Sequence, residues 1–366
     1  MENYFLSKIA LTNFRNLNND VVSFKKGINC IFGNNGNGKT NLLEAIYYLS
    51  HRKSFKKNIS FQQLINVECE TPEITFLSVF SNHKNESLSY SGKLNNLGST
   101  WYLDNKQTRK KLETKSVFIN PFDSFLFHTN TTFRRTWFDQ HFSLLDKEYK
   151  RALKDLNAAL RFRNQLLSKK PYDFENQILA NDHRYCELNL FVLQKRHYLL
   201  NQLNEYLSGI FKEIFDESHS LKLEIDSKCS GLNVLEMQNK LKEKLEKDKI
   251  IGHSNLGVHR DEYLFNFDGF NSFEFCSLGQ QKMSFLSLLF AYIELFRYKF
   301  KTYPIVLIDD VSGELDRSRW NNLIAFLKNK EFQVFITTAN ENFKKELEKI
   351  EEAQKIFITD GAVEIS

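Results

Sequence analysis

The sequence predicts an α/β fold in which a parallel-sheet core carries an added antiparallel sheet and an inserted α-helical arm. Three observations support this prediction. A glycine-rich loop follows a short apolar run at residues 28–32 and precedes a helical pattern. Polar and apolar residues alternate in several stretches between residues 74 and 103, as in antiparallel strands. From Thr131 onward, apolar residues recur at helical spacing as far as Ile214.

The glycine-rich loop has the pattern G-x-x-x-x-G-K-T, which is that of a phosphate-binding P-loop. Its residues are Gly33, Asn34, Asn35, Gly36, Asn37, Gly38, Lys39 and Thr40. Glycines allow the backbone to curl so that successive N–H groups converge on phosphate oxygens. We expect Lys39 to reach the β- and γ-phosphates and the Thr40 hydroxyl to ligate Mg²⁺. Because strand, loop and helix follow in the required order, a nucleotide site is predicted at the helix N-terminus.

Composition narrows the class of protein. At 366 residues, with 42% hydrophobic and 26% charged residues, the chain is long enough for two domains or for one domain with a large insertion. The five cysteines are scattered and form no C-x-x-C motif, which favours neither a disulfide framework nor a zinc site and fits a cytoplasmic location. The apolar run at 285–296 is too short to span a bilayer and is interrupted by Glu294. The net charge of +5 permits an acidic partner such as nucleic acid.

The remaining patterns divide the chain into three parts. Strands are expected at about 5–11, 20–24, 74–81, 86–91 and 100–103, with basic runs at 50–57 and 106–115. Apolar residues at coiled-coil spacing run from Tyr149 to Leu167, interrupted at Arg163, and again from Leu193 to Ile214. They predict two antiparallel helices of about 35–40 residues, each about 55 Å long; a plain helical domain covering the core fits the same pattern. The predicted parts are 1–125 and 251–366 for the nucleotide-binding head and 126–250 for the arm.

A second set of chemical residues lies near the C-terminus. The apolar run at 304–308 ends in Asp309 and Asp310, as in a buried parallel strand with acids at its carboxyl edge. Asp309 is expected to hold Mg²⁺ as a Walker B acid. Asp310 is placed to orient or deprotonate the attacking water, which makes it, with Lys39, a candidate catalytic residue.

Between the P-loop and these acids, a short segment precedes a helical run. Ser277, Gly279 and Gln280 stand where that helix begins, so hydroxyl and backbone N–H groups there could face a phosphate. The same residues also fit an ordinary helix cap. The order P-loop, Ser-x-Gly-Gln, Walker B is that of the ABC-type P-loop NTPases, in which the signature loop completes the nucleotide site of the opposite subunit. We therefore predict a homodimer joined by ATP.

The chain resembles the RecF family of bacterial recombination-repair ATPases over nearly its full length. The segments that carry the resemblance are Asn13–Leu17, the P-loop with Asn41–Ile46, Pro121–Asp123, Arg134–Asp139, Arg163–Asn164, Gly257–Glu262, Ser277–Lys282, Asp309–Val311 and Glu314–Asp316. The pair G-x-H-R-D-E and S-x-G-Q-Q-K is more specific than the N-F-R-N start, which SMC-like ATPases share.

The resemblance implies a head of the ABC/SMC type, dimerisation on DNA with ATP and Mg²⁺, and slow hydrolysis that releases the DNA. It implies action at gapped or single-strand/double-strand junction DNA, together with RecR and RecO, to load RecA. It also implies that Asp316 is the D-loop acid, that Asp123 lies in a Q-loop-like segment, and that Thr337 and Thr338 occupy the place of the transporter switch histidine. Departures from the family pattern are Val258, Gly313, Arg52 and Lys56.

Affinity for DNA would come mainly from lysine and arginine side chains that neutralise phosphates. The principal candidates are Arg52, Lys53, Lys56, Lys57, Arg109, Lys110 and Lys111. Further candidates are Lys106, Lys115, Arg161 and Arg163. Since the sequence contains no base-reading motif, little sequence specificity is expected.

Other classes of ATPase fit part of the pattern. An SMC-like condensin head would carry a far longer coil, and a transporter subunit would lack so long an insertion and would usually carry the histidine. A nuclease-associated ATPase would need a nuclease domain after the ATPase. Incubation with DNA and Mg²⁺ separates these classes, because strand cleavage would favour the third.

Overall fold

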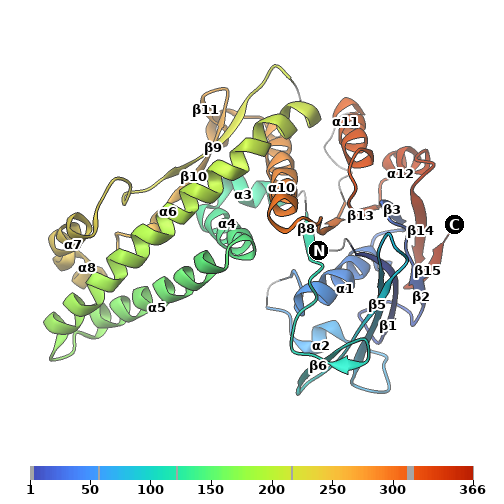
Figure 1. The fold of residues 1–366 in the computed structure, drawn as a ribbon, viewed down its shortest axis with the longest axis horizontal. Coiled ribbons are helices and arrows are strands. Elements are labelled where there is room, and N and C mark those ends of the chain that lie inside the picture. Colours follow the sequence, from blue (N-terminus) through green and yellow to red (C-terminus); the bar gives the residue numbers. More distant parts are fainter. Residues whose placement is uncertain (1–3, 57, 121–122, 216, 311–316, 366) are drawn as a thin grey trace. The chain divides into compact units, whose positions relative to one another are not determined.

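The computed structural model describes residues 4–56, 58–120, 123–215, 217–310 and 317–365 (Figure 1). The chain divides into two compact units: unit 1 contains residues 1–122, 213–215 and 292–366, and unit 2 contains residues 123–212 and 216–291. The sequence placed the end of the insertion at residue 250. The structure places it within a long helix, because residues 251–291 pack with the arm and not with the P-loop sheet.

A mostly parallel sheet forms the centre of unit 1, in the order β15-β14-β3-β13-β12-β8. The strands are β3 (Ile28–Phe32), β8 (Ser116–Ile119), β12 (Ile305–Ile308), β13 (Val334–Thr338), β14 (Gln354–Thr359) and β15 (Ala362–Ile365). Among the described strands of this sheet, only β15 is antiparallel to its neighbour. Every residue of β3, β12 and β13 is buried, as expected for strands covered on both faces. The helices of this part are α1 (Lys39–His51), α11 (Arg317–Lys328) and α12 (Glu341–Glu348).

The predicted antiparallel sheet is also present in unit 1, in the order β2-β1-β4-β5-β6-β7. Its strands are β1 (Phe5–Thr12), β2 (Val21–Ser23), β4 (Ile74–Ser81), β5 (Ser87–Asn95), β6 (Gly98–Leu103) and β7 (Lys106–Gln107), and the short helix α2 (Phe61–Leu64) precedes β4. One buried cluster contains side chains of α1 and of both sheets. Gly92 is required on β5, because a Cβ there would lie 2.5 Å from the Trp101 ring. Helix α1 is therefore fixed by apolar packing from both sheets.

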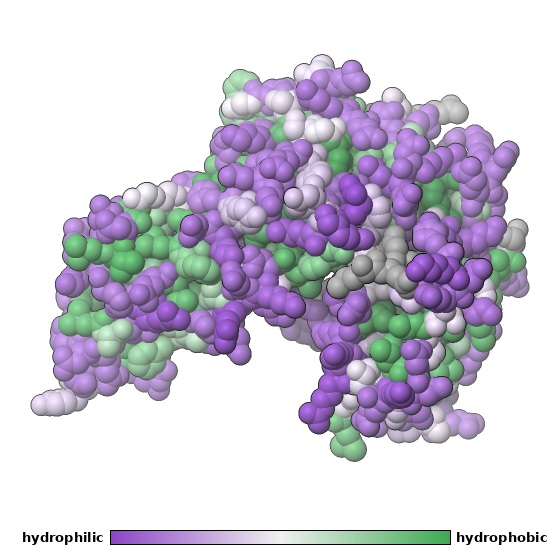
Figure 2. All heavy atoms as spheres, viewed as in Figure 1, coloured by the Kyte–Doolittle hydropathy of each residue, from purple (hydrophilic) through white to green (hydrophobic). Residues whose placement is uncertain are grey.

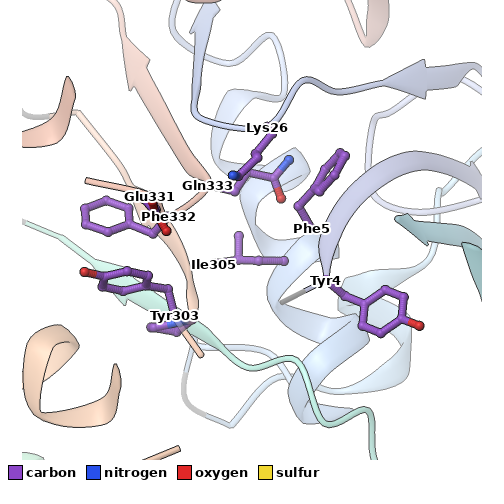
Figure 3. Close-up of a pocket in the computed structure, with 9 residues that line it drawn as sticks. Tyr4, Phe5, Lys26, Tyr303, Ile305, Glu331, Phe332 and Gln333 are labelled. Atoms are coloured by element: carbon purple, nitrogen blue, oxygen red, sulfur yellow. The ribbon is translucent and has the colours of Figure 1, made fainter. Parts of the chain in front are cut away.

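Two buried glutamines join the sheets at the end opposite the P-loop. Gln333, just before β13, accepts a hydrogen bond from the Leu6 N–H at 2.9 Å and donates to the Leu6 carbonyl at 2.8 Å. Gln354 donates to the Ser23 carbonyl at 2.7 Å. Figure 3 shows Gln333 beside Lys26 and Phe5 in a small pocket. The pocket has a volume of about 10 Å³, which is room for one water molecule. We therefore assign this end of the sheet a structural role.

Unit 2 contains the helical arm and a small sheet. Its helices are α3 (Asp123–Thr129), α4 (Thr131–Leu145), α5 (Lys147–Lys169), α6 (Phe174–Ile214), α7 (Val234–Glu243), α8 (Leu245–Ile251), a 3₁₀ turn at Val258–Arg260, α9 (Ser272–Phe275) and the first part of α10 (Leu278–Phe300). The strands are β9 (Leu221–Asp226), β10 (Glu262–Phe267) and β11 (Phe270–Asn271). In Figure 2, hydrophobic side chains are exposed on the arm formed by α5–α8. Leu235 and Ile250 are among the exposed hydrophobic residues of this part.

The first long helix of the arm differs from its prediction. Residues 131–170 do not form one helix, because Asp146 adopts an extended conformation and its carboxylate caps α5 by accepting from the N–H groups of Glu148 and Tyr149. Helix α5 therefore has 23 residues, whereas α6 has 41. At 1.5 Å per residue they are about 35 Å and 62 Å long. Lys169 is the last residue of α5, so its end before Pro171 is as predicted.

The interruption at Arg163 is a buried ion-pair site. The guanidinium is 0% exposed, and it donates to Asp182 at 2.7 Å, Asp248 at 2.9 Å and Ser254 at 2.7 Å. A second buried arginine, Arg196, pairs with Asp139 and Asp261 at 2.8 Å each. A buried charge is tolerated only when it is paired in this way. The expectation that Arg163 contacts DNA phosphates is therefore wrong.

None of the described helices is both long enough and apolar enough to cross a bilayer.

Buried histidines make the stability of the fold depend on pH. Burial lowers the pKa of His51 to about 3 and that of His128 to about 4, whereas the unfolded-chain pKa is about 6.5. Between these values the unfolded chain binds protons that the folded chain does not, so stability rises with pH. We expect the free energy of unfolding in urea to be highest above pH 6.5 and to fall as the pH decreases toward 4. His128→Asn should reduce this slope, and the same change at exposed His183 should not.

Candidate functional site

The P-loop connects the carboxyl end of β3 to the N-terminus of α1, as predicted. Gly33, Gly36 and Gly38 have φ angles of 153°, 89° and 112°, which lie in the region that favours glycine. At Gly33 a Cβ would lie 2.3 Å from the Ile358 carbonyl oxygen. Gly38 is the residue before α1, and no side chain caps the helix there. The first N–H groups of α1 are therefore oriented as a helix N-terminus presents them to an anion.

Lys39 lies over this loop. Its ammonium donates to the carbonyl oxygens of Gly33 at 2.7 Å and Asn34 at 2.9 Å, and the residue is 8% exposed. Burial lowers the pKa of Lys39, and the carboxylates of Asp310 and Asp309 oppose this shift. A phosphate bound in the loop would replace the two carbonyls as the partner of this cation.

The Walker B strand ends beside the same helix. Both oxygens of the Asp309 carboxylate lie near the Thr40 hydroxyl, at 3.0 and 2.9 Å. Thr337, at the end of β13, donates to Asp309 at 2.7 Å and accepts from the Asp310 N–H at 3.0 Å. The structure thus brings together Thr40, Asp309 and Asp310 from opposite ends of the chain. Asp310 has φ 49°, an uncommon backbone conformation for a residue other than glycine.

The donor set near Thr40 fits Mg²⁺ in the form that accompanies nucleotides. Within the residues that the structure describes, no three His, Cys, Asp or Glu side chains come together as a complete metal site. One hydroxyl and one carboxylate do meet at Thr40 and Asp309. Mg²⁺ is usually held by one or two such protein ligands together with phosphate oxygens and water. These two residues would therefore hold the ion only when a nucleotide is bound.

Two residues of this region make contacts that the sequence did not indicate. Asn16 donates from its amide to the Gly36 carbonyl at 2.9 Å and accepts from the Asn41 amide at 2.7 Å. Asn16 therefore holds the P-loop against the start of α1. Thr337 was identified only by its position in the family pattern, and its hydrogen bonds to both acids were not expected. No spacing rule would have indicated either contact, because each joins separate elements.

A pocket of about 200 Å³ lies beside the P-loop, on the side of α12. Phe32, Asn34, Thr338, Lys344, Phe357 and Thr359 are among the residues that line it. The rings of Phe32 and Phe357 are in contact, with centroids 5.4 Å apart. The P-loop therefore borders open space on this side.

The predicted signature residues lie in unit 2, at the N-terminus of α10. The Ser277 hydroxyl accepts from the Gln280 N–H at 3.3 Å, and the Gln280 side chain accepts from the Ser277 N–H at 2.9 Å. This reciprocal pair is a capping box, which the spacing of Ser277 and Gln280 is sufficient to predict. Ser277 is exposed, and Gly279 lies in the first turn of the helix. The cap does not exclude the signature role, which stays a prediction.

Other predicted residues are placed as follows. Asp123 is the first residue of α3, in unit 2. Asp316 and Lys57 lie outside the described residues. In the G-x-H-R-D-E segment, Gly257 has φ 143° and a Cβ there would lie 2.2 Å from the Tyr185 hydroxyl. Asp261 of this segment pairs with buried Arg196, so this part of the resemblance has a structural basis.

The DNA candidates separate into two groups. Arg52 donates to the Tyr90 hydroxyl at 2.9 Å and to the Arg109 carbonyl at 3.1 Å, with its guanidinium 5.0 Å from the Trp101 ring centroid. This set of contacts gives Arg52 a structural role and argues against it as a phosphate contact. Partners within the fold are also present for Lys56, Lys111 and Lys115. The exposed candidates are Lys53, Lys106, Arg109, Lys110 and Arg161.

Comparison with known proteins places this geometry in a class. The sequence profile of the RecF/RecN/SMC N-terminal domain matches residues 5–363. A Pyrococcus furiosus Smc head domain has a similar structure, with a TM-score of 0.54 and 16% identity over 99% of this chain and 96% of that chain. The chain therefore has the fold of an ABC/SMC-type P-loop ATPase head.

Within this class, some similarities are more specific. The DNA replication and repair protein RecF of Natranaerobius thermophilus is 30% identical over 386 aligned residues, covering 97% of each chain. That of Bacteroides thetaiotaomicron is 29% identical, covering 98% of this chain and 97% of the relative. A solved structure of the recombination mediator protein RecF with ATPrS has a TM-score of 0.83 at 24% identity, covering 100% of this chain and 98% of that chain. The chain belongs to the RecF family.

Thr337 gives a direct test of the site geometry. Thr337→Val removes a donor to Asp309 and an acceptor for the Asp310 N–H. A lost hydrogen bond to a charged group costs roughly 1.5–3 kcal/mol, so we expect the rate of nucleotide hydrolysis to fall by about tenfold or more. Nucleotide affinity, measured by fluorescence titration, should change by about twofold at most, because Thr337 does not belong to the P-loop. Thr337→Ser keeps the hydroxyl and should keep the rate; an equal loss in both variants would contradict this role.

Proposed function

We propose that this protein is an ATP-dependent DNA-binding protein of recombinational repair that dimerises on ATP and hydrolyses it slowly. The observation that carries the proposal is the contact of Thr40 with Asp309, which joins the P-loop to the Walker B strand. Membership of the RecF family supports it, because relatives of this family are DNA replication and repair proteins. The solved structures of relatives with ATP and with ATPrS support ATP as the nucleotide.

In this proposal the phosphates of ATP bind the N–H groups of residues 33–40 and the Lys39 ammonium. Thr40 and Asp309 hold Mg²⁺, which neutralises charge on the β- and γ-phosphates. Asp310 orients the attacking water or accepts its proton. Positioning and charge neutralisation supply most of the catalysis in phosphoryl transfer. These few groups would therefore support a weak, Mg²⁺-dependent and DNA-stimulated ATPase.

The dimer supplies the remaining contacts. Ser277, Gly279 and Gln280 of one copy would approach the γ-phosphate held by the P-loop of the other copy, with Asp316 as the D-loop acid and Asp123 in the Q-loop-like position. The N-terminus of α10, a helix of 23 residues, supports this role because it favours negative charge. ATP binding would then stabilise the dimer by mass action, and hydrolysis would release it.

DNA would bind mainly through its phosphates. The candidates that we retain belong to the same unit as the P-loop: they are the exposed Lys53, Lys106, Arg109 and Lys110 and the partly exposed Lys56. Contacts of this kind give little sequence specificity. From the resemblance to the RecF family we infer that the DNA is gapped or contains a single-strand/double-strand junction. We also infer that RecR is the direct partner and that RecO and RecA act together with RecR. This function would place the protein in the cytoplasm, at the nucleoid.

Nucleotide-dependent dimerisation is tested by light scattering. We expect ATP, and not ADP, to convert monomer into dimer. Lys39→Ala should abolish nucleotide binding, since it removes the cation of the P-loop. Ser277→Arg should keep nucleotide binding and block dimerisation, and Ser230→Arg, at an exposed turn of the same unit, should do neither. An unchanged mass in ATP, or normal dimers of Ser277→Arg, would refute the shared site.

DNA binding is tested with gapped and intact duplex in a salt series, with and without ATP. We expect ATP to tighten binding and the gapped duplex to bind more tightly. The triple change of Lys53, Arg109 and Lys110 to Gln should weaken binding and reduce the slope of log affinity against log salt by about 2–3. The same change at Lys147, Lys150 and Lys154, exposed lysines of α5, is the matched control. Equal effects of both triple variants would argue against the assigned surface, and cleavage of the DNA would favour a nuclease.

A further inference from the structure

One buried carboxylate connects the P-loop helix to two separate loops. Glu44 lies on α1, and its side chain is 0% exposed. Arg15 donates to it twice, at 2.9 and 3.1 Å, and the Ser54 hydroxyl donates at 2.5 Å. The Lys56 ammonium lies 3.3 Å from its second oxygen. Burial would raise the pKa of Glu44, but hydrogen bonds from Arg15 and Ser54 and the charge of Lys56 outweigh it and hold the pKa below its ordinary value.

The Arg15 side of this cluster leads to the P-loop. Arg15 has φ 56°, and its N–H donates to the Leu64 carbonyl at 2.7 Å. The next residue is Asn16, which bonds to the Gly36 carbonyl and to Asn41. The orientation of Asn16 therefore depends on how the Arg15 side chain is held by Glu44.

The Ser54 and Lys56 side leads to the basic loop, which we define as residues 52–56 between α1 and α2. The Ser54 hydroxyl also accepts from the Lys56 N–H at 2.9 Å, so one carboxylate orders both residues. The Lys56 side chain is 37% exposed, against 17% for Arg15. Lys56 is therefore the partner of Glu44 that an external phosphate can reach.

The charges make Lys56 the exchangeable partner. Glu44 carries one negative charge, and Arg15 alone can neutralise it through two hydrogen bonds. If Lys56 moves to a phosphate, the buried carboxylate stays paired, so the large cost of an unpaired buried charge does not arise. If Arg15 left instead, the carboxylate would keep a single, partly exposed cation, Lys56, and the uncharged Ser54 hydroxyl.

We propose that Glu44 is a positioning residue that couples DNA contact at the basic loop to the conformation of the P-loop. A DNA phosphate competes with Glu44 for Lys56. The carboxylate then keeps Arg15 as its charged partner, and the change reaches the Gly36 carbonyl through Asn16. This inference rests on the proposed function as a DNA-binding ATPase, and it assigns the route by which DNA stimulates hydrolysis.

The test compares ATP turnover with and without duplex DNA at saturating ATP. We expect Lys56→Met to bring the ratio of the two rates close to one, and Lys56→Arg to keep it, because arginine can also exchange between carboxylate and phosphate. Lys93→Met is the matched control: it removes a lysine of β5 that pairs at 2.8 Å with Glu73, the residue before β4, and it should leave the ratio unchanged. Glu44→Gln should also bring the ratio of the two rates close to one, because Lys56 of the basic loop is then released from residue 44 whether or not DNA is present.

A second measurement does not depend on turnover. In the wild type, DNA added without nucleotide should change the rate of amide hydrogen exchange at residues 33–38. The Lys56→Met variant should still bind DNA at high DNA concentration, but its exchange rates at these residues should not change. A normal stimulation ratio and a normal exchange response in Lys56→Met would overturn the inference and leave the proposed function intact. A wild type that neither binds DNA nor is stimulated by it would instead refute the proposed function.

Discussion

The contact between Thr40 and Asp309 is the constraint on which the site depends. The two residues are 269 positions apart in the chain and meet because β3 and β12 both pair with β13 in parallel register. Parallel strands bring their carboxyl ends to one edge of the sheet, so loops that follow different strands converge there. Every residue of β3, β12 and β13 is buried, which fixes these strands in the core. The position of the candidate Mg²⁺ ligands therefore follows from the packing of the sheet.

Buried charge has a consistent role in both units. Glu44 in unit 1 and Arg163 and Arg196 in unit 2 each have a side chain at most 2% exposed, and each is paired with more than one partner. Each also joins elements that are distant in sequence: Arg163 links α5 to α6 and α8, and Arg196 links α6 to α4 and the segment before β10. Such groups add little net stability relative to apolar packing, but removal of one partner is costly. They therefore specify which elements meet.

The sequence was sufficient to predict the elements whose signal is local. The P-loop with its flanking strand and helix, the Walker B strand, the antiparallel strands and the end of α5 before Pro171 follow from spacing and residue type. The break at Asp146 was missed because an extended cap residue between two helical patterns leaves the apolar spacing intact. Arg163 and Arg52 were misjudged as surface cations, because their partners come from other elements and a charge pattern does not indicate burial. The contacts of Asn16 and Thr337 were missed for the same reason.

Some of the positions where local rules fail lie near the P-loop. Asn13, Arg15 and Asp310 have φ angles of 58°, 56° and 49°, a conformation that costs a residue other than glycine roughly 1–3 kcal/mol. Each strained segment is held by a specific contact: Glu44 holds Arg15, Asn13 donates to the Glu73 carbonyl at 3.0 Å, and Thr337 accepts from the Asp310 N–H. Because the strain persists only while these contacts are made, a ligand that competes for one of them can release a defined segment. Strain at this edge of the sheet is thus a physical reason why nucleotide and DNA could influence each other through few side chains.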